Sequence, residues 1–202
     1  SGIMSITGSD KNNFCRVGTS IGDIVAGLYA VIGILTQLIY RDQTNKGSRL
    51  DLSMLDCQVA ILENAVARFS VEKTPPTPLG TDHPSITPFG AFKTKDGSIA
   101  IAAGNDKLFY QFCEAIGEKF LTKNKLFSNN ENRNKNLSTL RPLIEKKLMT
   151  KKTSYWQKKL TLQKIPNSKV NNIHEAIENS QIRNRKMILN YKDRKVRKLL
   201  IS

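Results

Sequence analysis

A run of prolines divides this chain into two parts. Residues 73–80, Lys-Thr-Pro-Pro-Thr-Pro-Leu-Gly, contain three prolines. Proline lacks the backbone N–H that a helix interior or a central strand needs. Turn-forming residues continue as far as Pro88. We therefore predict a linker over residues 73–88, with one folded region before it and another after it.

The region before the linker, residues 1–72, is expected to begin as a loop and to continue as a long helix. Residues 1–18 are rich in glycine and serine, whereas residues 20–41 are mostly apolar. Ser20 and Asp23 have the spacing of a capping box. Small residues on one side indicate close packing against another element; they are Gly22, Ala26, Gly27, Ala30 and Gly33.

The apolar stretch of this helix raises the question of a membrane span. The stretch of residues 24–40 is shorter than the ~20 apolar residues that a membrane-spanning helix needs, and it includes Thr36 and Gln37. We therefore expect a buried helix and no membrane span. A helix that is apolar nearly all round must be covered, and this chain alone is not expected to cover it fully.

Residues 48–62 have the pattern of a strand that leads into a helix. Leu50 and Leu52 alternate with charged residues, as in a half-buried strand. Ser53 can then cap a helix that continues to about Phe69.

Asp56 would lie in the first turn of that helix. Free backbone N–H groups and the helix dipole stabilise an anion there, and an ionised carboxylate so placed can act as a nucleophile. Ser53 and Asp56 also have the spacing of a capping box, in which the acid only helps the helix to start. From spacing alone we prefer the capping interpretation, so a chemical role for Asp56 needs other support.

The region after the linker, residues 89–177, has the pattern of a small α/β domain. Asp96-Gly97 is a strong hairpin sequence, and Gly104-Asn105 and Gly117 would start and end a helix. The other expected elements are strands over residues 89–93, 98–103 and 170–173, helices over 137–149 and 154–162, a loop or helix start over 128–136, and a helical turn over 174–177.

Residues 178–202 form a basic tail, within a chain whose formal net charge is +15. Between Arg183 and Lys198, eight basic residues accompany one acid, Asp193. The tail is either a basic helix for a membrane or nucleic acid, or a solvated, partly disordered segment, which we prefer. For the whole chain we rank a Lys- and Asn-rich composition bias first, an anionic ligand second and nucleic acid third.

The three cysteines are Cys15, Cys57 and Cys113, and they form no metal-ligand pattern. Their odd number and scattered positions predict a reducing compartment without disulfides or a metal site, and hence a cytoplasmic protein. No signal-peptide pattern is visible. Cys57 is either a reactive thiol at a helix start or a small buried side chain, and we prefer the latter.

Short motifs follow one another along the chain in a specific order. They are Ser-Gly-Ile-Met-Ser-Ile-Thr-Gly at residues 1–8, Arg16-Val-Gly-x-Ser-Ile-x-Asp23, Ala26-Gly-Leu-Tyr29, Gly33-Ile-Leu35, Thr44-x-Lys-Gly47, Ser53-Met-Leu-Asp56-x-Gln-Val59, Gly80-x-x-His-Pro84, Phe92-x-Thr-x-Asp-Gly97 and Gly104-Asn-Asp106. Together they resemble the class III CoA-transferases, the CaiB/BaiF family, as far as about Met187. The resemblance implies an α/β fold that comprises an incomplete Rossmann-like large domain, the linker and the small domain.

The resemblance also implies a chemistry. Asp56 would be the nucleophile that moves CoA from an acyl-CoA donor to a carboxylic acid through an aspartyl-CoA thioester. The segment from Gly80 to Gly90 would provide oxyanion-binding N–H groups, so Gly80, His83 and Gly90 are candidate substrate-binding residues. His83 would contact substrate or order the loop, and we prefer the latter. CoA and acyl-CoA would be substrates, with no permanently bound cofactor.

Two other functions stay open. The family includes an α-methylacyl-CoA racemase branch, in which Asp106 would be an acid/base group. The sequence Met54-Leu55-Asp56-Cys57-Gln58 is more similar to that of the transferases. The alternative from a different class is a basic binding or scaffold protein without activity.

The sequence also departs from the family pattern. Family members are about twice as long, and their N-terminal CoA-binding part has no counterpart here. The usual Pro-x-Gly-Pro-Val-Asn is replaced by Pro166-Asn-Ser-Lys-Val-Asn171. We therefore expect a fragment that works as an interlocked homodimer, as the family does, or with a complementing N-terminal half.

Overall fold

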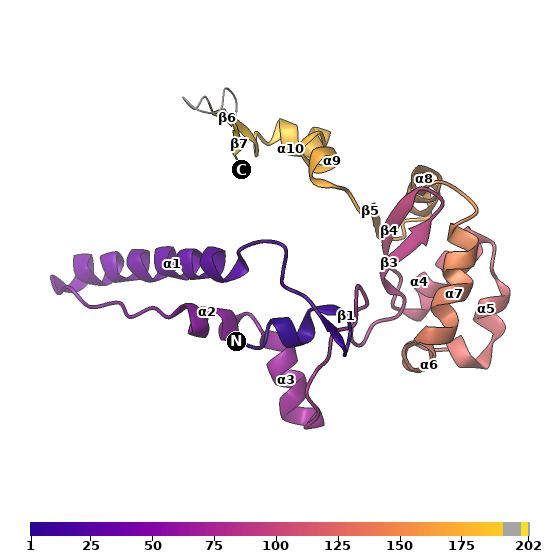
Figure 1. Cartoon of the computed structure of the whole chain (residues 1–202), viewed down its shortest axis with the longest axis horizontal. Helices are drawn as coiled ribbons and strands as arrows, with labels where there is room; N and C mark the ends of the chain where they lie inside the picture. The colour runs from indigo at the N-terminus through magenta and orange to yellow at the C-terminus, as the bar shows by residue number, and fades with distance from the viewer. Residues whose placement is uncertain (192–198, 202) are drawn as a thin grey trace. The chain divides into compact units, whose positions relative to one another are not determined.

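The computed structural model describes residues 1–191 and 199–201. The chain divides into two compact units, residues 1–84 and 85–202, each described by itself here. The boundary lies within the predicted linker. The mixture of helices and small sheets in Figure 1 agrees with the predicted α/β class.

The first unit is mainly helical. Its elements are η1 (Met4–Ile6), β1 (Gly8–Asp10), β2 (Asn13–Phe14), α1 (Ile21–Thr44), α2 (Met54–Ala60) and α3 (Glu63–Glu72). Strands β1 and β2 form an antiparallel pair. Helices α1 and α2 lie side by side (Figure 1).

Helix α1 confirms the long helix that the apolar pattern predicts, with 24 residues. It ends at Asn45, whose left-handed backbone lets its N–H donate to the Arg41 carbonyl at 2.7 Å. The capping box predicted at its start is wrong, because the Ser20 side chain makes no capping hydrogen bond. By length and composition alone, α1 is long and apolar enough to cross a membrane.

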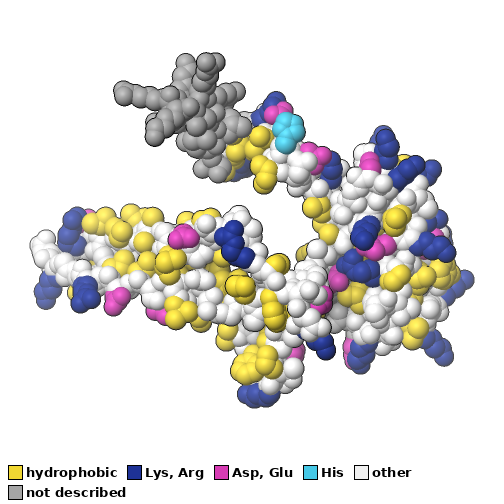
Figure 2. Space-filling view, in the orientation of Figure 1, with side chains coloured by type: hydrophobic (Ala, Val, Ile, Leu, Met, Phe, Trp, Pro, Cys, Tyr) yellow, Lys and Arg dark blue, Asp and Glu magenta, His cyan; other side chains and the backbone are white. Residues whose placement is uncertain are grey.

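Only a few residues of α1 are buried in this chain. Val25 and Ala26 pack with Cys57 of α2 in a small core. The larger apolar side chains stay exposed, and Figure 2 shows them gathered along the helix. They include Ile24, Leu28, Val31, Ile32, Ile34, Leu35, Leu38 and Ile39. The expectation that this chain does not cover the helix fully is confirmed.

The strand predicted at Leu50 and Leu52 is not formed. Residues 46–53 have no regular structure, because a strand depends on hydrogen bonds to a neighbouring strand and no described strand pairs with them. Leu50 instead packs on α1, where a Cβ atom on Gly33 would lie 2.8 Å from Leu50 Cδ2. The predicted small-residue contact of α1 is therefore confirmed at Gly33.

The helix predicted to continue to Phe69 is interrupted. A turn at Ile61 and Leu62 separates α2 from α3, and the Leu62 N–H donates to the Val59 carbonyl at 3.0 Å. Because this bond joins residues three apart, the helical ladder tightens and stops there. Helix α3 then begins at Glu63, an acid at the positive end of the new helix dipole.

The second unit is a small sheet covered by helices. Its elements are β3 (Phe89–Thr94), β4 (Gly97–Ala102), α4 (Asp106–Ile116), α5 (Phe120–Lys123), η2 (Lys125–Phe127), α6 (Asn130–Lys135), α7 (Leu137–Leu148), α8 (Thr153–Leu162), β5 (Asn167–Lys169), α9 (Ile173–Ile177), α10 (Ser180–Asn184), β6 (Leu189–Tyr191) and β7 (Leu199–Ile201). The sheet order is β3-β4-β5, with all neighbours antiparallel. Strands β6 and β7 form a separate antiparallel pair.

The core of this unit joins the sheet to the helices. The fully or nearly fully buried side chains include Phe92, Ile99 and Ile101 from the sheet, Phe109, Phe112 and Ile116 from α4, Leu140, Ile144 and Leu148 from α7, and Trp156 and Leu160 from α8. Helix α7 lies along β3 (Figure 1). The Trp156 indole N–H donates to the Leu148 carbonyl at 2.6 Å, so this buried polar group is satisfied.

One expectation for this unit needs correction, and one falls partly outside the described residues. The strand predicted over residues 170–173 is instead Asn167–Lys169, because these residues pair with 99–101 of β4. Of the two alternatives for the Asn-rich stretch 128–136, a loop or a helix start, the structure shows the helix start: α6 is capped by Asn129. Of the basic tail, residues 180–184 are helical and 189–191 form a strand, whereas 192–198 lie outside the described residues.

Candidate functional site

Asp56 occupies the first turn of α2, as the sequence predicts. Ser53 is the N-cap, with an extended backbone, and its Oγ accepts a hydrogen bond from the Asp56 N–H at 3.3 Å. The Cys57 N–H donates to the Ser53 carbonyl at 3.1 Å, so the helical ladder begins at this serine.

The carboxylate of Asp56 is not used to cap the helix. A complete capping box needs a second bond, from the N-cap backbone to the acid. Asn172 and Glu175 form both bonds at the start of α9. At α2, within the described part of the chain, only the serine half is present. Asp56 is exposed, so its carboxylate is accessible to a reactant.

A hollow of about 330 Å³ lies next to Asp56. Its wall combines α1, the irregular segment before α2 and the start of α2. The lining residues are Tyr29, Ile32, Gly33, Leu50, Asp51, Leu52, Ser53, Asp56, Cys57 and Ala60. This wall is mostly apolar, so it offers a surface on which the apolar part of an acyl group can pack beside the carboxylate.

Gly80 and His83 lie in the first unit, close to a second hollow of about 210 Å³. Gly80 lines this hollow with a left-handed backbone of φ 62°, and its N–H donates to the Gly8 carbonyl at 2.9 Å. Because that N–H is already bonded, it is not available as an oxyanion donor in this arrangement. His83 is partly buried.

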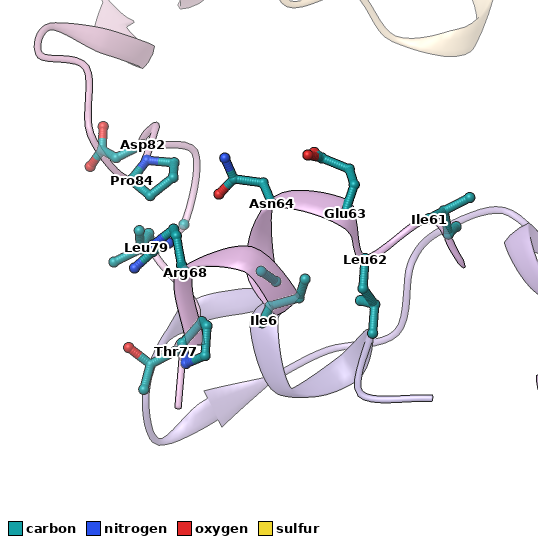
Figure 3. Close-up of a pocket in the computed structure, with 13 residues that line it drawn as sticks. Ile6, Ile61, Leu62, Glu63, Asn64, Arg68, Thr77, Leu79, Asp82 and Pro84 are labelled. Carbon is teal, nitrogen blue, oxygen red and sulfur yellow. The ribbon is translucent and has the colours of Figure 1, made fainter. Parts of the chain in front are cut away.

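Figure 3 shows how α3 contributes to this second hollow. Glu63 and Asn64 lie at the start of the helix and Arg68 lies further along it, opposite Leu79 and Asp82. Acids and a base therefore line the hollow together, and it does not favour a ligand of one charge.

Gly90 belongs to the second unit and to a strand rather than a loop. It is buried in β3 and lies opposite Ile101 of β4. The structure therefore divides the predicted 80–90 loop between two units, with Gly80 and His83 in one and Gly90 in the other.

Asp106 is the first residue of α4 in the second unit. Asn105 caps this helix by accepting the Leu108 N–H at 2.8 Å, as the sequence predicts. The Asp106 carboxylate forms an ion pair with Arg133 of α6 at 2.9 Å. Arg133 is completely buried, and the sequence patterns do not identify it because its partners are far away along the chain.

The three cysteines are all free, and they differ in their exposure to solvent. Cys15 is exposed, whereas Cys57 and Cys113 are buried, which fits the preferred interpretation of Cys57 as a packed side chain. Burial raises the pKa of Cys113 from 9.0 to about 12, although the nearby Arg133 charge opposes this effect. Among the described residues, no group of three or more His, Cys, Asp and Glu side chains is arranged to hold a metal ion.

Comparison with known families gives an extended match. The family model for CoA-transferase family III matches residues 1–201. The chain belongs to CoA-transferase family III. The match continues beyond Met187, where the motif-based resemblance ends, and includes the β6–β7 pair.

Named relatives are CoA-transferases. The chain is 32% identical over 190 residues to the acetyl-CoA:oxalate CoA-transferase of Acetobacter aceti, covering 94% of this chain and 49% of the relative. It is 32% identical over 182 residues to the succinyl-CoA:glutarate CoA-transferase of Homo sapiens, covering 90% of this chain and 42% of the relative. The chain thus spans about half the length of these family members.

Solved structures agree with this assignment. A CAIB/BAIF family protein from Brucella suis is similar with a TM-score of 0.81 and 30% identity, covering 93% of this chain and 50% of that one. A protein from Mycobacterium tuberculosis has a TM-score of 0.82 at 18% identity, covering 99% of this chain and 52% of that one, and supports the fold alone.

Proposed function

We propose that this chain carries the nucleophile of a class III CoA-transferase. The observation that supports this most directly is the state of Asp56. It occupies the family's motif position, and its carboxylate is exposed beside an apolar hollow rather than used as a cap. The proposed activity moves CoA from an acyl-CoA donor to a small carboxylic acid.

The proposed reaction has four steps at one carboxylate. Asp56 attacks the donor thioester carbonyl and expels CoA thiolate, which leaves an acyl-aspartyl anhydride. The thiolate then attacks the aspartyl carbonyl, giving an aspartyl-CoA thioester and the free donor acid. The acceptor carboxylate attacks this thioester and again expels CoA thiolate. Attack of the thiolate on the acceptor carbonyl of the new anhydride releases acceptor-CoA and regenerates Asp56.

Substrate class and cellular setting follow from the relatives and from composition. The named relatives act on oxalate or glutarate with acetyl-CoA or succinyl-CoA as donors, so we infer a short-chain acyl-CoA and a small carboxylic acid. A net charge of +15 favours anionic substrates. Three free cysteines are consistent with the proposed cytoplasmic location.

We further propose that the active form contains a second chain. The chain spans about half of its relatives, and α1 presents a long apolar face that the described residues do not cover. A homodimer or a complementing N-terminal half would cover that face.

Intact-protein mass spectrometry after incubation with succinyl-CoA tests the proposal. The wild-type chain should gain a CoA-sized adduct that Asp56→Asn does not gain. Asp42→Asn is the matched control, because Asp42 is an exposed acid of the same unit that does not line this hollow, and it should still form the adduct. If the chain forms no adduct either alone or with a relative's N-terminal half, the transferase proposal is wrong. Salt-sensitive binding to nucleic acid would then favour a basic binding protein.

A further inference from the structure

Among the described residues of the second unit, Arg133 is the one charged residue that is buried. Its side chain has no solvent exposure. Its guanidinium donates to the carbonyl oxygens of Thr87, Gly104 and Phe127, at 2.8, 2.9 and 3.3 Å. These carbonyls belong to three separate segments: the end of the linker, the turn between β4 and α4, and η2. One side chain therefore connects all three.

Asp106 supplies the negative charge for this group. Its Oδ1 lies 2.9 Å from Arg133 Nη2, while the guanidinium lies 4.4 Å from the centre of the Phe109 ring. Arginine stays protonated inside proteins, so the buried Arg133 carries its charge away from water. The Asp106 side chain is 63% exposed, so its carboxylate reaches this buried guanidinium from the surface of the unit.

Two further side chains of α6 hold the end of the linker. Asn130 accepts the Thr87 N–H at 2.9 Å and donates to the Ser85 carbonyl at 2.7 Å. Asn134 accepts the Thr87 hydroxyl at 3.0 Å. Residues 130, 133 and 134 have the spacing of one helix face. That face of α6 is therefore hydrogen-bonded to Ser85 and Thr87, at the end of the linker.

We propose that Arg133 is a positioning residue that locks residues 85–88 to the Gly104–Asp106 turn, with Asp106 as the ion-pair partner of its guanidinium rather than a proton-transferring group. This inference rests on the proposed transferase function and deepens it, because it separates that function from the racemase branch. A racemase acid/base group must gain and lose a proton in each turnover. Protonated Asp106 would leave Arg133 without its carboxylate in every cycle.

Hydrogen exchange of the full chain without substrate tests the positioning role. Arg133→Met should increase amide exchange at least tenfold in peptides that cover residues 85–92 and 103–109. Lys135→Met is the matched control, because Lys135 lies on the same helix in an exposed ion pair with Glu131. This variant should leave the amide exchange rate of both peptides unchanged. Unchanged exchange in Arg133→Met would overturn the proposal.

Three more variants, Asp106→Asn, Asp106→Glu and Arg133→Ala, test the proposal if Arg133→Met does not fold. Asp106→Asn keeps the size of the side chain and removes the charge, so both peptides should again exchange faster while α8 stays protected. Asp106→Glu, which keeps the charge, should exchange more slowly than Asp106→Asn. In Arg133→Ala, millimolar ethylguanidinium should restore protection of both peptides, which a general loss of packing would not allow. Absence of both effects would overturn the proposal.

Deuterium incorporation at the α-carbon of 2-methylacyl-CoA in heavy water tests the chemical part. We expect either no incorporation or incorporation that survives Asp106→Asn. Incorporation by the wild type that Asp106→Asn abolishes would overturn the proposal. A missing CoA adduct on Asp56 would instead count against the transferase function, while the exchange data would still decide whether Arg133 positions these segments.

Discussion

Gly104 lies so close to Ile86 that a Cβ atom on Gly104 would come within 1.8 Å of Ile86 Cγ2. Real Cβ atoms are essentially never found at such a distance, so only glycine fits here without movement of the chain. The contact joins the end of the linker to the turn before α4, the two segments that Arg133 also connects. Steric fit and a buried charge thus fix the same junction.

Gly104→Ala should destabilise the second unit by about 1–3 kcal/mol, because the added methyl group forces Ile86 or the backbone to shift. Urea unfolding of the full chain measures this change. Gly97→Ala is the control, because a Cβ atom there would meet only the Thr153 hydroxyl, at an ordinary 3.4 Å. Equal stability of the two variants would show that the junction is more adaptable than its geometry indicates.

Asp96 in the β3–β4 turn should make stability depend on acid pH. Its Oδ1 accepts the backbone N–H of Thr153 at 2.7 Å and the Thr153 hydroxyl at 2.9 Å. The backbone bond, followed by the hydroxyl bond, lowers the pKa of Asp96 below its ordinary value of 3.8. Because the folded-state pKa is depressed, this contribution is fully present above the unfolded pKa near 3.8 and is lost as pH falls through the folded pKa.

Urea midpoints measured between pH 6 and about pH 2 test this expectation. Asp96→Asn should lower the midpoint at pH 6 and should reduce the loss of stability below pH 4 relative to wild type. Asp51→Asn removes an exposed acid and controls for the loss of one charge. If the urea midpoint of Asp96→Asn falls with pH below 4 as steeply as that of the wild type, the prediction is wrong.

Local sequence signals predicted the elements whose partners lie nearby in the chain. Asp96-Gly97 predicted a hairpin, and its pairing runs from Phe89 opposite Ala102 to Thr94 opposite Gly97. The turn itself is Lys95-Asp96, one residue earlier than predicted, because Gly97 is the first residue of β4. Asn105 and Gly117 gave both ends of α4, because a cap and a left-handed residue act within one helical turn. Asp56 was placed in the first turn of α2 for the same reason.

Features that depend on distant partners were missed. Leu50 and Leu52 alternate with charged residues as in a strand, but no strand forms there. A strand also needs a neighbouring strand to pair with, and local alternation does not show whether one is present. Arg141 of α7 donates to the Ala91 carbonyl at 2.9 Å, and Glu145 accepts the Lys93 N–H at 3.1 Å. These side chains cover the open edge of β3 across about fifty residues of sequence, and no periodicity indicates such pairs.

Thiol labelling should distinguish the three cysteines. Cys15 is exposed and should react first with iodoacetamide at pH 8, whereas buried Cys57 and Cys113 should be protected in the folded chain. A pKa near 12 leaves Cys113 with about a thousandfold less thiolate than a pKa of 9.0 would. Peptide mass mapping with and without urea measures the order in which the three cysteines are labelled. Cys15→Ser should abolish the rapid phase of labelling. Rapid labelling of Cys113 in the folded state would contradict its burial.

The apolar face of α1 should make the isolated chain self-associate. Leu28 and Ile32 are each 60% exposed, and contiguous apolar surface of this kind drives association in water. Leu28→Gln with Ile32→Gln should increase the monomer fraction in light scattering and change the free energy of unfolding by less than about 0.5 kcal/mol, because neither side chain is packed in this chain. Val25→Gln is the contrasting variant: Val25 is buried against Cys57, so this change should lower stability instead. A monodisperse wild-type monomer at high concentration would contradict the prediction and weaken the proposal that a second chain covers α1.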